Sequence, residues 1–168
     1  MGTRKRMRIL LGSLIISAFL LVSVAQVMAE TWNCKSMGKV IKREGSLIPD
    51  VEGHWVGISV SEGATICDNG EMGWWTSLFF WDGVKGIGAY TQYITMALQD
   101  GSTITNVVKD KRTPGDFKYI AEIINGTGRF VGIKGTVTVE GKTLPPEKGE
   151  IIGKSASKVI FTFTLPPK

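Results

Sequence analysis

The chain has few of the residues on which most enzyme active sites and metal sites depend. Its 168 residues include one histidine and two cysteines, and these three side chains cannot make a structural zinc site of the usual four-ligand kind. No Gly-x-Ser-x-Gly elbow is present, which argues against a serine hydrolase. The sequence therefore predicts no metal and no cofactor.

A dinucleotide-binding loop is also missing, although part of its pattern occurs. Gly126 and Gly128 begin a Gly-x-Gly, but Val131 stands where the third glycine of Gly-x-Gly-x-x-Gly would be. The residues that follow predict a strand, so no helix N-terminus is available to hold phosphates. These glycines favour a turn and the tight curvature of a small barrel.

The first 29 residues are typical of a cleaved signal peptide. A basic start is followed by an apolar run, Ile9–Val24, and then by Val27 and Ala29 at the −3 and −1 positions of a small-residue cleavage site. The alternative is an uncleaved membrane anchor, but the run is shorter than the ~20 residues that a spanning helix needs. We expect export to the periplasm or the medium, with Glu30 as the mature N-terminus and no membrane contact after cleavage.

Removal of that segment changes the charge of the protein. The full chain has 20 basic and 15 acidic residues, but four basic and no acidic residues precede Glu30, which leaves a net charge of +1. Little remains of a basic surface for nucleic acid. The mature chain is long enough for one domain with a sizeable core.

Helical periodicity is scarce after residue 30, whereas strand-like alternation bounded by glycine turns is frequent. We expect an all-β fold, a small antiparallel barrel of about eight strands, over residues 51–168, preceded by an N-terminal arm at residues 30–50. A surface loop is expected at Leu144–Gly149. The expected strands are Gly53–Ser61, Thr65–Cys67, Met72–Trp81, Ile87–Leu98, Thr103–Lys109, Phe117–Ile124, Phe130–Glu140 and Lys158–Leu165.

Cys34 and Cys67 are expected to form one disulfide, because exported proteins fold in an oxidising environment. The bond would close a loop of about thirty residues and contribute about 3–4 kcal/mol on the chain-entropy model. The alternative is two free or intermolecular thiols.

One expected strand, Trp74–Trp81, carries large apolar groups on both faces, so both faces should be covered. The outer cover is either the N-terminal arm or another subunit. The inner face of a small barrel can hold one apolar ligand. Our candidates for the lining of such a cavity are Trp74, Phe80 and Tyr90.

Two blocks of the sequence carry a family resemblance: Val51–His54 through Gly70-Glu71 to Asp100–Ile104, and Asn125–Gly135 continuing to Gly141-Lys142. They resemble the allene oxide cyclase-like barrel superfamily, which includes the dirigent proteins of plants, and most closely its exported bacterial members. The similarity spans about Val51–Leu165. The resemblance implies an eight-stranded barrel with a central cavity, often trimeric, whose active members steer the cyclisation or coupling of a hydrophobic substrate.

The candidate catalytic residues are His54, Glu62 and Glu71. Asp50, Glu52 and His54 are spaced by two, so a carboxylate could raise the pKa of the imidazole and form an acid/base pair. The alternative is a hydrogen-bonded histidine at the rim of the core. Glu62 and Glu71 flank the first hairpin and could project towards the barrel mouth as general bases, or they could be solvated turn residues.

Three functions are compatible with this pattern. The first is a non-catalytic exported barrel that binds a small hydrophobic molecule or acts as an interaction module. The second is a cofactor-free isomerase or cyclase that uses Glu62 or Glu71 on an apolar substrate. The third is a structural oligomer whose barrel is filled by side chains and holds no ligand.

Overall fold

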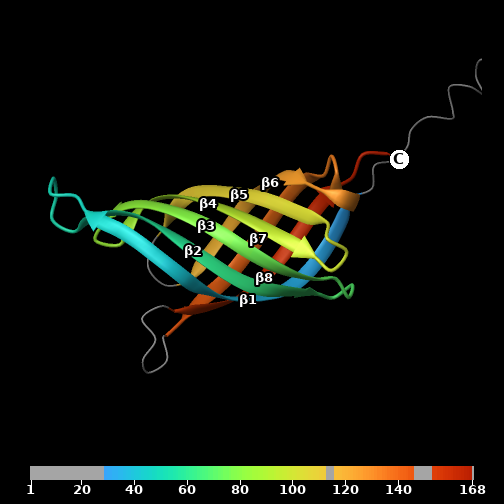
Figure 1. Ribbon diagram of the computed structural model, residues 1–168, viewed down its shortest axis with the longest axis horizontal. Coiled ribbons are helices and arrows are strands. Elements are labelled where there is room, and N and C mark those ends of the chain that lie inside the picture. The colour runs from blue at the N-terminus through green and yellow to red at the C-terminus, as the bar shows by residue number, and fades with distance from the viewer. Residues whose placement is uncertain (1–28, 113–115, 146–152, 168) are drawn as a thin grey trace, which may run out of the picture. The chain divides into compact units, whose positions relative to one another are not determined.

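The computed structural model describes residues 29–112, 116–145 and 153–167. It shows a closed antiparallel barrel in which each strand pairs with the next and the last pairs with the first (Figure 1). The predicted all-β barrel is confirmed for this part of the chain. Its elements are β1 (Glu30–Leu47), β2 (His54–Cys67), β3 (Met72–Val84), β4 (Ile87–Leu98), β5 (Thr103–Arg112), β6 (Phe117–Gly126), the 3-10 turn η1 (Gly128–Phe130), β7 (Lys134–Leu144) and β8 (Lys154–Thr164).

The segment expected to be an N-terminal arm is instead the first wall strand. β1 pairs with β2 on one side and with β8 on the other, so the barrel begins at Glu30 and not at residue 51. Trp32, Cys34 and Ser36 are buried and alternate with exposed neighbours, which is the period of two that a barrel wall requires. Without β1, the edge of β8 would lack a partner.

One end of the barrel is closed by packed aromatic rings. The ring of Trp32 meets those of Phe130 and Phe163 edge-on, with centroids 5.6 and 5.1 Å apart, and lies 6.2 Å from that of Phe161. All four side chains are buried. We call these four rings the floor of the barrel, because they fill its interior at the end that carries η1.

The glycine block at residues 126–135 contributes to this floor and does not form a simple hairpin. β6 ends at Gly126, η1 follows, and β7 starts only at Lys134, so the strand expected from Phe130 starts four residues later. Gly128 has φ +60°, a conformation that favours glycine. The turn directs Phe130 inward, where its side chain is 2% exposed.

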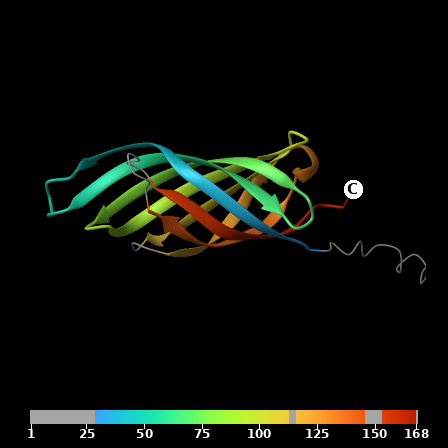
Figure 2. The same ribbon diagram turned by 90° about the horizontal axis from the view of Figure 1, so that it is seen from below.

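At the opposite end, the residues that the structure describes leave the barrel open. The β1–β2 and β3–β4 hairpins project there, away from η1 (Figure 1, Figure 2). β5 pairs with β6 only near the closed end, from Ile104 opposite Gly126 to Val107 opposite Glu122. Nearer the open end these two strands are not paired. We call this end the mouth.

Several expectations concern residues outside the described ranges. The signal peptide expected at residues 1–29 falls, except for its last residue, at residues 1–28, and most of the expected loop Leu144–Gly149 falls at residues 146–152. Within the described ranges, no helix is long and apolar enough to cross a membrane. No cluster of three or more histidine, cysteine or acidic side chains among the same residues could hold a metal ion.

Candidate functional site

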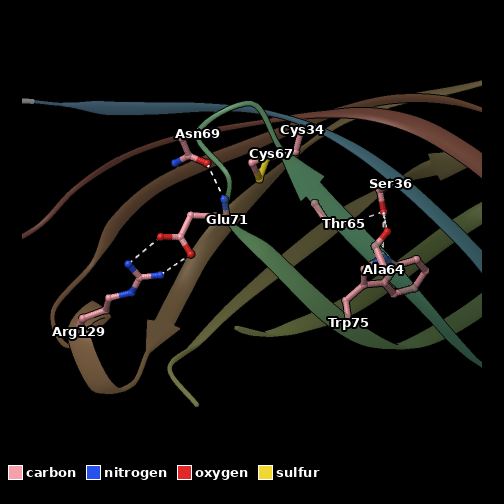
Figure 3. Close-up of a disulfide and its surroundings, with 9 residues drawn as sticks. All are labelled: Cys34, Ser36, Ala64, Thr65, Cys67, Asn69, Glu71, Trp75 and Arg129. Carbon is pink, nitrogen blue, oxygen red and sulfur yellow. Dashed lines mark hydrogen bonds and ion pairs between the residues drawn. A yellow bond between two sulfur atoms is a disulfide. The ribbon is translucent and has the colours of Figure 1, made fainter. Parts of the chain in front are cut away.

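Cys34 and Cys67 form a disulfide, which confirms the predicted pairing (Figure 3). The two residues are direct partners in the β1–β2 register, and both are buried next to the floor. The bond therefore ties the first strand of the barrel to its neighbour beside the aromatic floor.

Between the floor and the mouth, the barrel encloses a cavity of about 400 Å³. Alternate residues of the strands line it, because every second side chain of a barrel strand points inward. The lining combines apolar and aromatic side chains with hydroxyl and amide groups, and charged groups appear towards the mouth. The lining residues used below are Ser36, Arg43, Trp75, Phe79, Tyr90, Gln92, Ile94, Asn106, Asp110, Asp116 and Tyr119.

Trp75 is held across the cavity wall by a hydrogen-bond network (Figure 3). Its Nε1 donates to the Ser36 hydroxyl at 2.9 Å, and the Thr65 hydroxyl donates to the same oxygen at 3.0 Å. The indole ring occupies the space where Gly38 and Gly63 have no side chain. These two glycines leave room for a large ring inside a narrow barrel.

Aromatic rings continue towards the mouth. Phe79 stacks on Tyr90 with centroids 5.1 Å apart, and on Trp81 at 6.3 Å. Phe117 stacks on Tyr119 at 6.1 Å. Burial, together with the nearby Tyr90, raises the pKa of Tyr119, so its hydroxyl keeps its proton and can donate a hydrogen bond.

A second hollow of about 260 Å³ lies towards the projecting hairpins. It shares Arg43, Ser59 and Phe79 with the main cavity, and it adds Trp55 and Trp81. The guanidinium of Arg43 lies 5.9 Å from the centre of the Trp55 ring. The route into the barrel is thus lined by aromatic rings and a cation.

No protein-family model matches this sequence, and no curated protein matches it. Solved structures do resemble it in three dimensions. The pterocarpan synthase dirigent protein PsPTS1 superimposes with a TM-score of 0.54 at 12% identity, over 83% of this chain and 97% of that one. The fold is a dirigent-like β-barrel.

The pterocarpan synthase dirigent protein GePTS1 gives a TM-score of 0.53 at 12% identity, over 86% of this chain and 95% of that one. A pyocyanin demethylase is more distant, with a TM-score of 0.42 at 17% identity over 79% and 99% of the two chains. At these identities the similarity to the dirigent proteins establishes the architecture of the barrel alone.

The dirigent-like barrel brings one of the three expected cavity residues into its lining. Tyr90 lies in the cavity wall, but Trp74 and Phe80 lie on the outer surface with 74% and 43% of their side chains exposed. The correction follows from the period of two in β3, which turns Trp75 and Phe79 inward and their even-numbered neighbours outward.

The two expected catalytic glutamates are also outside the cavity. The carboxylate of Glu62 lies 3.4 Å from Lys39 Nζ on the outer wall. Glu71, in the β2–β3 turn at the closed end, binds the guanidinium of Arg129. Neither side chain reaches the mouth, because β2 ends at the floor and not at the open end.

His54 lies at the mouth end between two carboxylates and does not line the cavity. Its Nδ1 is 2.6 Å from Asp50 Oδ1, and its Nε2 is 2.8 Å from Asp82 Oδ1. The bond to Asp82, followed by that to Asp50, raises the pKa of His54. Of the two carboxylates expected beside the imidazole, Asp50 contacts it, whereas Glu52 lies 3.7 Å from Lys85. Both residues precede β2, so the expected common strand face with His54 does not form.

Several residues of the lining were not expected from the sequence, above all Trp75, Phe79, Asn106 and Tyr119. The signal for the first two was present, since β3 alternates and its odd-numbered positions include Gly73, Ser77 and Gly83, which suit a crowded interior. The position of Asn106 between Ile104 and Val108 in one inward row was the corresponding signal on β5.

Proposed function

We propose that this protein is an exported binder of a small hydrophobic molecule, which it holds inside the barrel. The observation that carries the proposal is the cavity of about 400 Å³, closed by the aromatic floor at one end and open at the other. Cavities of about 300–1,000 Å³ with apolar walls and a few polar groups are typical of small-molecule sites.

Both the fold and the disulfide support this proposal. A dirigent-like barrel agrees with the resemblance seen in the sequence, whose members handle hydrophobic substrates in the barrel interior. The Cys34–Cys67 bond is compatible with export, because disulfides persist mainly outside the cytosol.

The two alternative functions are less well supported. The proposed cyclase needs a carboxylate deep in the barrel, but Glu62 and Glu71 are outside it, and the carboxylates among the described lining residues are Asp110 and Asp116, close to the mouth. The filled structural barrel is not compatible with the open cavity. Binding is the function that uses the observed space.

A pair of tryptophan substitutions on one strand tests the binding proposal. Ile94 lines the cavity, whereas its neighbour Tyr93 lies on the outer face of β4 and is 41% exposed. The probe is N-phenyl-1-naphthylamine, whose fluorescence rises in apolar surroundings. We expect Ile94→Trp to weaken probe binding about tenfold or more by occupying the cavity, and Tyr93→Trp to leave it within about twofold.

A folded wild-type protein that does not bind the probe, or equal affinities for the two variants, would contradict the proposal. Circular dichroism checks that both variants keep the barrel. Native mass spectrometry of protein purified from its host adds a second measurement, because a retained ligand and the number of subunits appear in the same spectrum.

We also propose that the outer face of β2–β4 contacts further copies of this chain. β1 lies in the wall beside β2, so the segment expected to cover this face does not cover it. The face carries neighbouring exposed apolar side chains on adjacent strands, a pattern found where subunits meet. These side chains are Ile58, Ile66, Met72, Trp74, Phe80 and Tyr93.

A further inference from the structure

The interior of the barrel contains one polar side chain that is surrounded by apolar neighbours. Asn106 on β5 is 3% exposed and lies between Ile104 and Val108 in the inward row of that strand. Its cross-strand partners are also apolar, Ile94 on β4 and Ile123 on β6. A hydrophobic residue of similar size would fit this position equally well, so packing does not explain the amide.

The amide oxygen of Asn106 has no hydrogen-bond partner. It is the one buried side-chain nitrogen or oxygen atom without a partner among the residues that the structure describes. Burial of an amide oxygen without a partner destabilises a protein, because the hydrogen bond to water is lost and not replaced. Since Asn106 lines the cavity, the partner can come from a molecule bound there.

Other polar groups of the same cavity are hydrogen-bonded within the protein. The Ser36 hydroxyl donates to the Ala64 carbonyl oxygen at 3.1 Å and accepts from Trp75. Gln92 donates from Nε2 to the Ser77 hydroxyl at 3.1 Å. These hydrogen bonds hold the wall, whereas the buried oxygen of Asn106 has no partner among the described residues.

We propose that Asn106 Oδ1 accepts a hydrogen bond from a hydroxyl or N–H group of the bound ligand. This inference rests on the proposed binding function and adds the polarity of the ligand to it. The ligand is an uncharged, mainly apolar molecule with a hydrogen-bond donor. The donor points at β5, and the apolar body lies against Trp75, Phe79 and Tyr90.

The test compares two probes of nearly the same shape. 2-Naphthol has a hydroxyl donor, and 2-methoxynaphthalene has an ether oxygen that can only accept. The measured quantity is the dissociation constant of the ether divided by that of the naphthol. We expect this ratio to fall about fivefold from the wild type to Asn106→Leu, the effect of one typical buried hydrogen bond. Comparison of the two proteins cancels the different solubilities of the probes.

Gln92→Leu is the matched control. It also replaces an amide of the cavity wall by an apolar side chain, but that amide already donates to Ser77. The probe ratio should therefore stay within about twofold of the wild type. The inference is wrong if Asn106→Leu leaves the ratio unchanged, or if Gln92→Leu lowers it as much.

Denaturation of the ligand-free protein gives an independent measurement. If Asn106 Oδ1 lacks a partner, Asn106→Leu should raise the midpoint of urea unfolding, because an apolar side chain removes a buried unpaired group. A lowered midpoint would show that the protein or a fixed water already satisfies the oxygen, and would overturn the inference. If the wild type binds neither naphthalene probe nor N-phenyl-1-naphthylamine, the proposed function itself fails.

Discussion

Arg129 holds the carboxylate of Glu71 with two hydrogen bonds, from Nη1 to Oε1 at 2.8 Å and from Nη2 to Oε2 at 2.6 Å (Figure 3). The same guanidinium lies 3.0 Å from Asp100 through its Nε atom. Three turns, those between β2 and β3, β4 and β5, and β6 and β7, thus meet at one side chain. Arg129 fastens the closed end of the barrel from outside, while Phe130 fills it from inside.

The first prediction concerns this ion pair. Arg129→Met should lower the free energy of unfolding by about 1–2 kcal/mol, because a bidentate arginine–carboxylate pair stabilises a protein more than a single surface ion pair does. The loss stays in this range because Arg129 is partly exposed to solvent. Lys118→Met removes a single exposed ion pair, in which Lys118 Nζ lies 3.4 Å from Glu140 Oε2. It should change the free energy of unfolding by less than about 0.5 kcal/mol. Urea denaturation measures both variants. Equal losses would show that Arg129 does not fasten the turns.

The second prediction concerns the protonation of His54, which is the single histidine of the chain. Its pKa is raised above 6.5, most strongly by the hydrogen bond to Asp82 and then by that to Asp50. Titration of the imidazole Cε1 proton by NMR should therefore give a pKa above 6.5. Asp82→Asn should lower this pKa more than Asp50→Asn. A wild-type value below 6.5 would contradict the geometry.

The same shift sets the direction of a pH effect on stability. A histidine whose pKa is higher in the folded state stabilises the fold when it is protonated. This stabilisation is complete below the unfolded-state pKa and is lost as the pH rises through the folded-state pKa. The difference in urea midpoint between the wild type and His54→Gln should therefore shrink as the pH rises above 6.5. A difference that grows with pH would rule out the charged form of His54 as the stabilising one.

The third prediction concerns the disulfide. Replacement of both Cys34 and Cys67 by serine should lower the free energy of unfolding by about 3–4 kcal/mol, since 33 residues separate the two cysteines. Urea denaturation of the wild type with and without a reductant provides the comparison. The reductant should leave the midpoint of the double serine variant unchanged, and any shift there would point to an effect other than reduction of this bond.

The fourth prediction concerns the outer face of β2–β4. Trp74→Lys and Phe80→Lys should reduce the subunit number seen by native mass spectrometry, because a charged side chain opposes burial in an apolar interface. Ile120→Lys is the control, since Ile120 is 66% exposed on β6, away from this face. A wild type that is already monomeric, or an effect of Ile120→Lys equal to the others, would contradict the interface.

Much of the fold could be predicted from the sequence because turns and strands are local. Asp68–Gly70 and Asp100–Gly101 mark tight turns, and alternation between them marks strands, whatever lies further along the chain. The sequence pattern does not reveal β1 as a wall strand, since its exposed second half does not alternate clearly and its partner β8 is distant in sequence.

The candidate site depended on the direction of each side chain, which is a property of register. A shift of one residue exchanges the two faces of a strand, and large apolar side chains occupy both faces of Trp74–Trp81. The small residues at the odd-numbered positions of β3 were therefore the single, weaker signal for choosing Trp75 over Trp74. The choice came from the pairing of β3 with β2, in which Trp75 lies opposite Gly63 and has room for its ring.

By itself, the sequence determined the barrel class, the disulfide partners and the positions of the turns, because composition and short-range periodicity encode them. Only the tertiary structure decided which residues face the cavity and which carboxylates are tied to cations outside it. It also left the oxygen of Asn106 without a partner. These properties arise when eight strands close in one register, and that closure depends on contacts between residues far apart in the chain.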